Sequence, residues 1–262
     1  MGQKKSQQSQ KSQHPKNVSS SSSPSASRGA LGEVLQAKSV PWQPMINAVA
    51  KRFDAEYEGQ AFDLPEEVEA MPVFRDWAAG SLNSRIASPF WEIAQPKKNQ
   101  HCLDLGCGFS FLIYEWKSWQ ALFHGQDISE FATKTLHQRG PQLDSKLFKE
   151  VRQGPAHKLD YAPASFDLVL ATGFSCYYPM DYWQAVMEAV RPLLKPGGFL
   201  VFDVIDPAQA IAENWAILET YLGADVFLES LSQWQSLIKT VNARVVKQQP
   251  GELFHLYKVR WS

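Results

Sequence analysis

The pattern of apolar and polar positions divides the chain into three stretches. Residues 1–28 are Gln, Ser and Lys with very few apolar positions, and a segment of this kind cannot bury a core, so we expect a disordered tail. Residues 29–97 place apolar side chains at helical spacing, for example Val49, Phe53 and Tyr57, and predict a helical extension or lid. Residues 98–262 carry the third pattern, which is the most regular.

In this third stretch, short apolar runs alternate with amphipathic segments. The runs predict strands over residues 101–105, 123–127, 149–153, 166–172 and 199–204. The segments between them predict helices over 110–120, 130–139 and 181–194. Alternation of strand and helix favours an α/β fold in which helices cover both faces of a parallel sheet.

Local signals set the expected ends of several elements. Gly140 and Pro141 predict the end of the helix that begins near residue 130. Ser88 and Asp181 are expected to cap the starts of two other helices. After helices over 208–222 and 231–242, strands over 243–247 and 253–259 flank a Pro-Gly turn. A tight turn joins antiparallel neighbours, so we expect a mostly parallel sheet with a reversed strand at its edge.

Composition narrows the possible partners. The 262 residues are 44% hydrophobic with a net charge of −1. The tail alone is +5, which leaves −6 for the remainder, and a mildly acidic body predicts no nucleic-acid partner. No apolar run reaches the length of a membrane span. Three cysteines make no disulfide framework and no metal-ligand spacing, so we expect a cytoplasmic protein without a metal site.

The first two strands of the regular stretch carry the chemistry. Residues 101–110 read as a strand followed by a glycine turn, and the next strand ends in Asp127. Glycines let the backbone approach a ligand closely, and a carboxylate accepts hydrogen bonds from two ribose hydroxyls. The pattern predicts a site for a nucleoside-bearing cofactor, although Asp127 alone would also suit an ordinary strand end.

Four segments in order extend this interpretation: Asp104–Gly108, Gly125–Asp127, Ser165–Val169 and Arg191–Gly198. Together they resemble the class I S-adenosylmethionine-dependent methyltransferases, and the resemblance covers residues 98–262. It implies a three-layer Rossmann-like fold, S-adenosylmethionine as cofactor and methyl transfer as the reaction.

The resemblance also implies roles for individual residues. The glycine turn lies under the amino-acid end of the cofactor, the acid after the second strand holds the ribose, and the loop after the third strand frames the adenine. The implied cofactor-binding residues are Asp104, Gly106, Cys107, Gly108, Asp127, Ile128, Ala156, His157 and Thr172. Two positions depart from the family pattern: Ser110 replaces a third glycine, and Pro155 replaces an acid that would bind the adenine amino group.

The acceptor side is less defined. Tyr177 and Tyr178 follow the fourth predicted strand and are candidates for an acceptor pocket, although core packing would explain them equally well. His157 is a candidate general base, because its pKa suits neutral pH, but it would also serve to frame the adenine. With the helical extension as a lid, we expect a small apolar or aromatic acceptor.

Two other functions fit parts of the sequence. A nicotinamide-dependent dehydrogenase would need glycine at position 111, which is Phe111. A non-catalytic methyltransferase-like domain that binds a partner or senses the cofactor would explain Pro155. The order of the four segments favours the methyltransferase.

Overall fold

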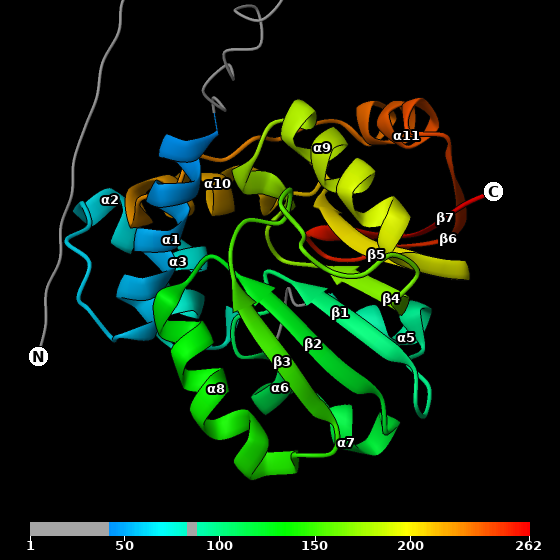
Figure 1. Cartoon of the computed structure of the whole chain (residues 1–262). Coiled ribbons are helices and arrows are strands. Elements are labelled where there is room, and N and C mark those ends of the chain that lie inside the picture. Colours follow the sequence, from blue (N-terminus) through cyan, green and yellow to red (C-terminus); the bar gives the residue numbers. More distant parts are fainter. Residues whose placement is uncertain (1–41, 83–87) are drawn as a thin grey trace, which may run out of the picture. The chain divides into compact units, whose positions relative to one another are not determined.

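The computed structural model describes residues 42–82 and 88–262, which belong to one compact unit. Its centre is a seven-stranded sheet in the order β3-β2-β1-β4-β5-β7-β6 (Figure 1). The strands are β1 (His101–Leu105), β2 (Leu122–Asp127), β3 (Phe148–Gln153), β4 (Phe166–Ala171), β5 (Leu194–Ile205), β6 (Ala243–Pro250) and β7 (Phe254–Trp261). The predicted tail at 1–28 lies outside the described residues.

The sheet is mixed, as the turn between the last two strands predicts. Strand β7 runs antiparallel to both β5 and β6, and the pairings among β1 to β5 are all parallel. The expected antiparallel last strand is confirmed, and the structure adds that β7 lies between β5 and β6, so that β6 forms this edge of the sheet. A tight turn fixes only that two strands are neighbours, so the sequence left the second partner of β7 open.

Helices cover both faces of the sheet and the carboxyl ends of its parallel strands. Helices α9 and α11 pack on one face, α5 to α8 pack on the other, and α1, α3 and α10 gather at the strand ends (Figure 1). The α-helices are α1 (Gln43–Tyr57), α2 (Glu66–Glu69), α3 (Pro72–Ala78), α5 (Phe90–Ala94), α6 (Ser110–Ile113), α7 (Trp116–Trp119), α8 (Glu130–Asp144), α9 (Met180–Val190), α10 (Ala212–Leu222) and α11 (Leu231–Thr240). Short 3-10 turns, η1 (Ser175–Tyr177) and η2 (Arg191–Leu193), flank α9.

The central strands are apolar on both sides because both faces are covered. In β4, Val169 faces the α9 side, and Leu168 and Leu170 face the α5–α8 side. All three are buried, which explains why the continuous apolar run of β4 was readable from the sequence.

Two helix predictions were wrong. The single helix expected over 110–120 is two short helices, α6 and α7, because the backbone at Tyr114 is extended (ψ 166°). The Tyr114 ring packs against Phe90 at a centroid distance of 5.0 Å. Helix α8 does not end at Gly140 but continues through Pro141 to Asp144. A Cβ at Gly140 would lie 2.5 Å from the Phe148 ring, so this glycine permits close packing of β3 rather than ending the helix.

Both predicted caps were also wrong. Pro89 precedes α5, and the Ser88 hydroxyl donates a hydrogen bond to Asp203 on β5 instead of capping the helix. Helix α9 begins at Met180, so Asp181 lies in its first turn and accepts a hydrogen bond from the Trp42 indole at 3.3 Å. Ser88 is therefore bound to a tertiary partner, whereas the Asp181 carboxylate has both a tertiary partner and a local one, the backbone N–H of Tyr182 at 2.9 Å.

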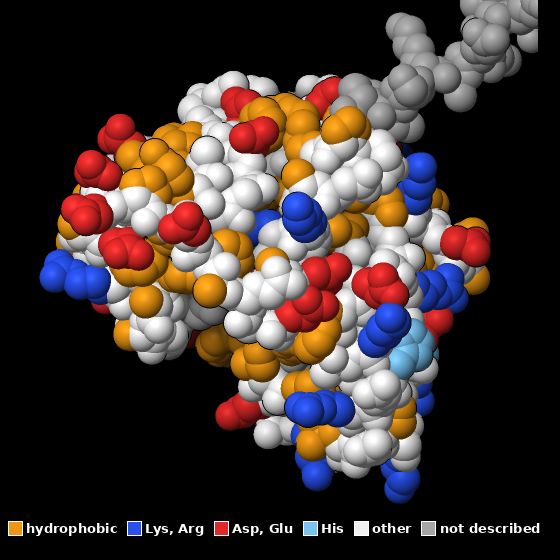
Figure 2. Space-filling view, turned by 90° about the vertical axis from the view of Figure 1, so that its left-hand side faces the viewer, with side chains coloured by type: hydrophobic (Ala, Val, Ile, Leu, Met, Phe, Trp, Pro, Cys, Tyr) orange, Lys and Arg blue, Asp and Glu red, His pale blue; other side chains and the backbone are white. Residues whose placement is uncertain are grey.

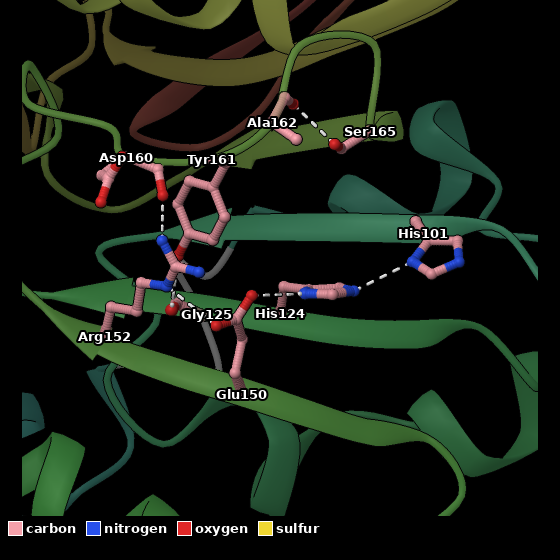
Figure 3. A network of polar contacts seen from close by, with 9 residues as sticks. All are labelled: His101, His124, Gly125, Glu150, Arg152, Asp160, Tyr161, Ala162 and Ser165. Carbon is pink, nitrogen blue, oxygen red and sulfur yellow. Dashed lines mark hydrogen bonds and ion pairs between the residues drawn. The ribbon is translucent and has the colours of Figure 1, made fainter.

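One face of β1, β2 and β3 carries a polar network (Figure 3). His101 and His124 lie 3.0 Å apart between ring nitrogens, and His124 contacts the Glu150 carboxylate at 3.1 Å. Arg152 pairs with Glu150 at 2.8 Å and lies over the Tyr161 ring at 4.0 Å. An irregular segment rather than a helix connects β3 to β4, which leaves this face partly exposed and suits polar side chains.

The edge strand β6 is mostly exposed. Val245 and Val246 are among the exposed large hydrophobic residues, and the pairing with β7 is irregular between Val245 and Lys247. The strand ends at Pro250, whose backbone has no N–H to offer a further strand.

Candidate cofactor and acceptor site

The carboxyl ends of the parallel strands border one large cavity. Residues at the ends of β1, β2, β4 and β5 line it, and α1 and α10 contribute further walls. Its volume is about 650 Å³. Open α/β sheets bind ligands at this edge, where neighbouring strands connect in opposite directions, and the order β2-β1-β4 contains that reversal.

The structure brings together most of the residues singled out from the sequence. The cavity lining includes Asp104, Gly106, Cys107, Gly108, Asp127, Ile128, Ala156 and Thr172, together with Tyr177 and Tyr178. These positions are far apart in the chain and meet only because β1, β2 and β4 are neighbours.

His157 is the exception. It is not part of the cavity lining, and its ring packs edge-on against Trp42 and Tyr182 at centroid distances of 5.2 and 5.0 Å. Burial lowers the pKa of His157, and neither ring nitrogen has a hydrogen-bond partner among the described residues. The structure thus separates His157 from the other candidates.

The glycine turn after β1 needs its glycines. Gly106 and Gly108 have positive φ angles of 66° and 45°. A Cβ at Gly106 would lie 2.7 Å from the Phe174 ring, and one at Gly108 would lie 2.6 Å from the Tyr57 hydroxyl. The turn is therefore tightly enclosed, and its backbone forms the floor of the cavity.

Asp127 holds the turn against the end of β2. Its carboxylate accepts hydrogen bonds from the backbone N–H groups of Gly108 and Ser129, both at 2.7 Å. A carboxylate has about four acceptor positions, so Asp127 retains capacity for a ligand. Burial raises the pKa of Asp127, while the two backbone hydrogen bonds act in the opposite direction. The ribose-binding role remains a prediction, and the structural role is evident.

Asp104 and Cys107 are also enclosed. Burial raises the pKa of Asp104 to about 7, although the Ser110 hydroxyl donates a hydrogen bond to its carboxylate. Ser110, at the position where the family pattern has a third glycine, therefore has a defined polar role. Burial raises the pKa of the Cys107 thiol well above its usual range, which makes it a poor nucleophile.

A buried polar cluster lines the opposite wall. The Arg52 guanidinium donates two hydrogen bonds to Glu219, at 2.8 and 3.0 Å, and also pairs with Glu56. The Tyr177 hydroxyl donates to Glu219 at 3.0 Å. The Tyr178 ring stacks on the Tyr182 ring, with 4.1 Å between the ring centroids. Burial holds the pKa of both cavity tyrosines well above the usual range, so neither is a base at neutral pH.

Several lining residues were not identified from the sequence. They come from α1 (Val49, Arg52, Phe53, Glu56, Tyr57), from β5 (Asp203) and from α10 (Trp215, Glu219). The apolar spacing predicted α1 itself but not its place beside the sheet. One signal was available: Arg52 shares a helical face with the apolar Ile46 and Val49, and a charge on such a face needs a buried partner.

The loop after β3 is fixed by a side chain rather than by an acid. Gln126 donates hydrogen bonds to the carbonyl oxygens of Pro155, at 2.9 Å, and Lys158, at 3.1 Å. Ala156 is buried and borders the cavity. Gln126 therefore holds the loop through backbone carbonyl groups, and Pro155 itself presents no side-chain hydrogen-bond acceptor.

Sequence comparisons agree with this architecture. Residues 103–202 match the model of a methyltransferase domain. The chain is 26% identical over 152 residues to a sterol 4-C-methyltransferase of Caenorhabditis elegans, covering 57% of this chain and 43% of that protein. It is 29% identical over 115 residues to a ubiquinone biosynthesis O-methyltransferase of Thiobacillus denitrificans, covering 42% of this chain and 47% of that protein. The chain spans less than half of the length of these curated relatives.

Solved structures share the fold. A geranyl diphosphate C-methyltransferase of Streptomyces coelicolor superposes with a TM-score of 0.60 at 10% identity, covering 85% of this chain and 100% of that one. A magnesium protoporphyrin IX methyltransferase of Synechocystis was solved with bound S-adenosylmethionine. It superposes with a TM-score of 0.58 at 14% identity, covering 83% of this chain and 97% of that one. At such identities the likeness concerns the fold alone.

Proposed function

Because this chain belongs to the class I S-adenosylmethionine-dependent methyltransferases, we propose that it transfers the methyl group of that cofactor to a small-molecule acceptor. The observation that carries the proposal is the single cavity in which the Gly106–Gly108 turn and Asp127 meet. Its volume of about 650 Å³ falls within the range of pockets that enclose small ligands.

The lining residues fit the cofactor in three places. Asp127 accepts hydrogen bonds from the ribose hydroxyls with its remaining acceptor capacity. Ile128 and Ala156 contact the adenine, and the enclosed backbone of the glycine turn supports the amino-acid end. Gly106 and Gly108 support this assignment, because both border the cavity with no side chain of their own between the backbone and a ligand.

The remaining wall favours an apolar or aromatic acceptor. Aromatic and aliphatic side chains dominate it: Val49, Phe53, Trp77, Leu82, Trp91, Ile113, Trp215 and Phe254. Among the described lining residues the only cation is Arg52, which Glu219 and Glu56 already neutralise. None of these described residues offers a free positive charge to a carboxylate or phosphate on the acceptor. We therefore propose that the part of the acceptor that enters the cavity carries no negative charge.

The outer surface also supports a small acceptor. The face in Figure 2 carries acidic, basic and hydrophobic side chains side by side, without the continuous charge that steers a large charged partner.

Among the described residues, no helix has the length and apolar content needed to cross a membrane.

The proposed mechanism is alignment rather than acid–base activation. When bound, the cofactor would supply a methyl group activated by the positive charge of its sulfonium. The chain holds the two molecules in line and excludes water, which is the main requirement for such a displacement. Tyr177 and Tyr178 shape the cavity, and their raised pKa values keep both hydroxyls protonated.

The first experiment measures cofactor binding. Replacing Asp127 with Ala removes the carboxylate at the end of β2 and should weaken S-adenosylhomocysteine binding by about 2–3 kcal/mol, since hydrogen bonds to a charged group are lost. Isothermal titration calorimetry checks this, with NAD as a ligand that should not bind. Unchanged affinity for S-adenosylhomocysteine in the Ala variant would contradict the assigned site.

A second candidate function is a sensor domain that binds the cofactor without methyl transfer. Pro155, which leaves the adenine amino group without a side-chain acceptor, favours it. Incubating the protein with radiolabelled cofactor and fractionated metabolite extracts separates the two functions. A labelled small-molecule product supports the enzyme, and cofactor binding with no labelled product from any fraction supports the sensor.

A further inference from the structure

Asp203 on β5 is a buried carboxylate in the cavity wall that neither the sequence pattern nor the proposed mechanism uses. Asp203 is 1% exposed to solvent, and it borders the cavity. The Ser88 hydroxyl donates to one carboxylate oxygen, and the Gly173 backbone N–H donates to the other at 2.8 Å. No Lys or Arg of the described residues pairs with it.

The sheet register places Asp203 on the same side as Asp104. Asp104 on β1 pairs with Leu170 on β4, which pairs with Val201 on β5. Because side chains alternate along a strand, Asp203 points to the same face as Val201 and lies two residues closer to the carboxyl end of β5. The two carboxylates therefore flank the end of β4 from either side.

The cavity lining is consistent with this register. Asp104, Asp203 and the Tyr114 side chain all border the same cavity. Burial raises the pKa of Tyr114 to about 12, and the charges of Asp104 and Asp203 act in the same direction.

Two buried carboxylates without a described cation are energetically unfavourable when ionised, and burial raises the pKa of Asp203 to about 6 and that of Asp104 to about 7. A cation that can donate hydrogen bonds would remove this cost. The sulfonium of the cofactor carries charge but no N–H or O–H. The α-ammonium carries both, and the glycine turn that supports the amino-acid end lies beside Asp104.

We propose that Asp203, oriented by Ser88 and Gly173, binds the α-ammonium group of the cofactor together with Asp104. This inference rests on the proposed function, since it needs S-adenosylmethionine in the cavity. It adds a binding residue on β5 to those that the glycine turn and β2 supply.

The test is a thermodynamic cycle between one side chain and one ligand group. S-Adenosylhomocysteine and its deamino analogue, in which hydrogen replaces the α-amino group, are titrated calorimetrically into the full chain and into Asp203→Asn. The substitution should weaken S-adenosylhomocysteine binding about 10- to 100-fold, because a hydrogen bond between two charged groups is lost. The deamino analogue should bind both proteins with equal affinity.

Two control variants make the outcomes distinct. Asp167→Asn changes a carboxylate at the opposite end of β4, which accepts hydrogen bonds from Lys195 and from the backbone of His101, and it should leave both affinities unchanged. Asp127→Asn should weaken both ligands, because both carry the ribose.

If Asp203→Asn binds S-adenosylhomocysteine as tightly as the natural chain, or loses both ligands equally while it remains folded by circular dichroism, this inference is overturned and the proposed function stands. If the natural chain binds neither ligand, the proposed function itself fails, and this inference with it. Should Asp203→Asn not fold, Ser88→Ala decides: a loss of a few-fold for S-adenosylhomocysteine alone supports the proposal, and an equal effect on both ligands overturns it.

Discussion

At the scale of single residues, the site is defined by three buried acids. Asp104, Asp127 and Asp203 line one cavity, and burial raises the pKa of each. The sequence pointed to Asp104 and Asp127 because each belongs to a recognisable segment around a glycine turn or a strand end. Asp203 follows an apolar run with no such neighbour, so only the sheet register brings it into the cavity.

The raised pKa values predict the pH dependence of cofactor binding. In the ligand-free protein, part of the Asp104 and Asp203 population is protonated near neutral pH, with pKa values of about 7 and about 6. An ammonium group favours the ionised forms, so binding releases protons and affinity should rise with pH up to about 7. Of the groups that face these acids, Ser88, Ser110 and Tyr114 stay neutral in this range, and the charge of Asp127 further raises the pKa of Asp104.

Calorimetry in buffers between about pH 5.5 and 7.5 checks this prediction. The affinity for S-adenosylhomocysteine should increase about tenfold or more over the range, and the deamino analogue should respond less. An affinity that falls as the pH rises would show that the acids bind the ligand in their protonated form.

At the scale of elements, the strands were readable and the helix boundaries less so. β1 matches its predicted bounds, since a buried strand between covered faces is a continuous apolar run. The break at Tyr114 and the continuation of α8 past Gly140 depend on Phe90 and Phe148, which are distant in the sequence. Residue patterns within one helix contain no information about contacts with residues that are distant in the sequence.

The contact between α1 and α10 gives a prediction at this scale. Two guanidinium nitrogens of Arg52 on α1 donate hydrogen bonds to the two carboxylate oxygens of Glu219 on α10, and both side chains are buried. Arg52→Met leaves the Glu219 carboxylate buried without its cation, with the Tyr177 hydroxyl still donating a hydrogen bond, and should lower the free energy of unfolding by about 3–5 kcal/mol. Urea denaturation checks this value.

The double variant Arg52→Met with Glu219→Gln provides the control. Because it removes the unpaired charge, it should recover part of the stability lost in Arg52→Met. If the two substitutions are simply additive, the ion pair does not couple the two helices.

At the scale of the whole unit, one cavity connects elements from both ends of the chain. α1, the ends of β1, β2, β4 and β5, and α10 all contribute to its walls. The sequence predicted the α/β fold and the order of the cofactor segments. It did not predict that α1 and α10 would complete the site, because their side chains meet there only in the folded unit.

Ligand binding should therefore stabilise the unit as a whole. With S-adenosylhomocysteine at about 100 times its dissociation constant, the free energy of unfolding should rise by about 2.7 kcal/mol. Hydrogen exchange measured by mass spectrometry should show added protection in both 43–57 and 212–222. Protection confined to the glycine turn would mean that the two helices do not enclose the ligand.

The irregular pairing of β6 has a consequence for how the protein behaves at high concentration. A regular outer strand with two adjacent exposed valines would be a template on which copies of the chain could add to one another. The break in register between Val245 and Lys247, the charge of that lysine and the missing N–H of Pro250 interrupt the template. We therefore expect β6 to remain the outer strand of the sheet and not to pair with further copies of the chain.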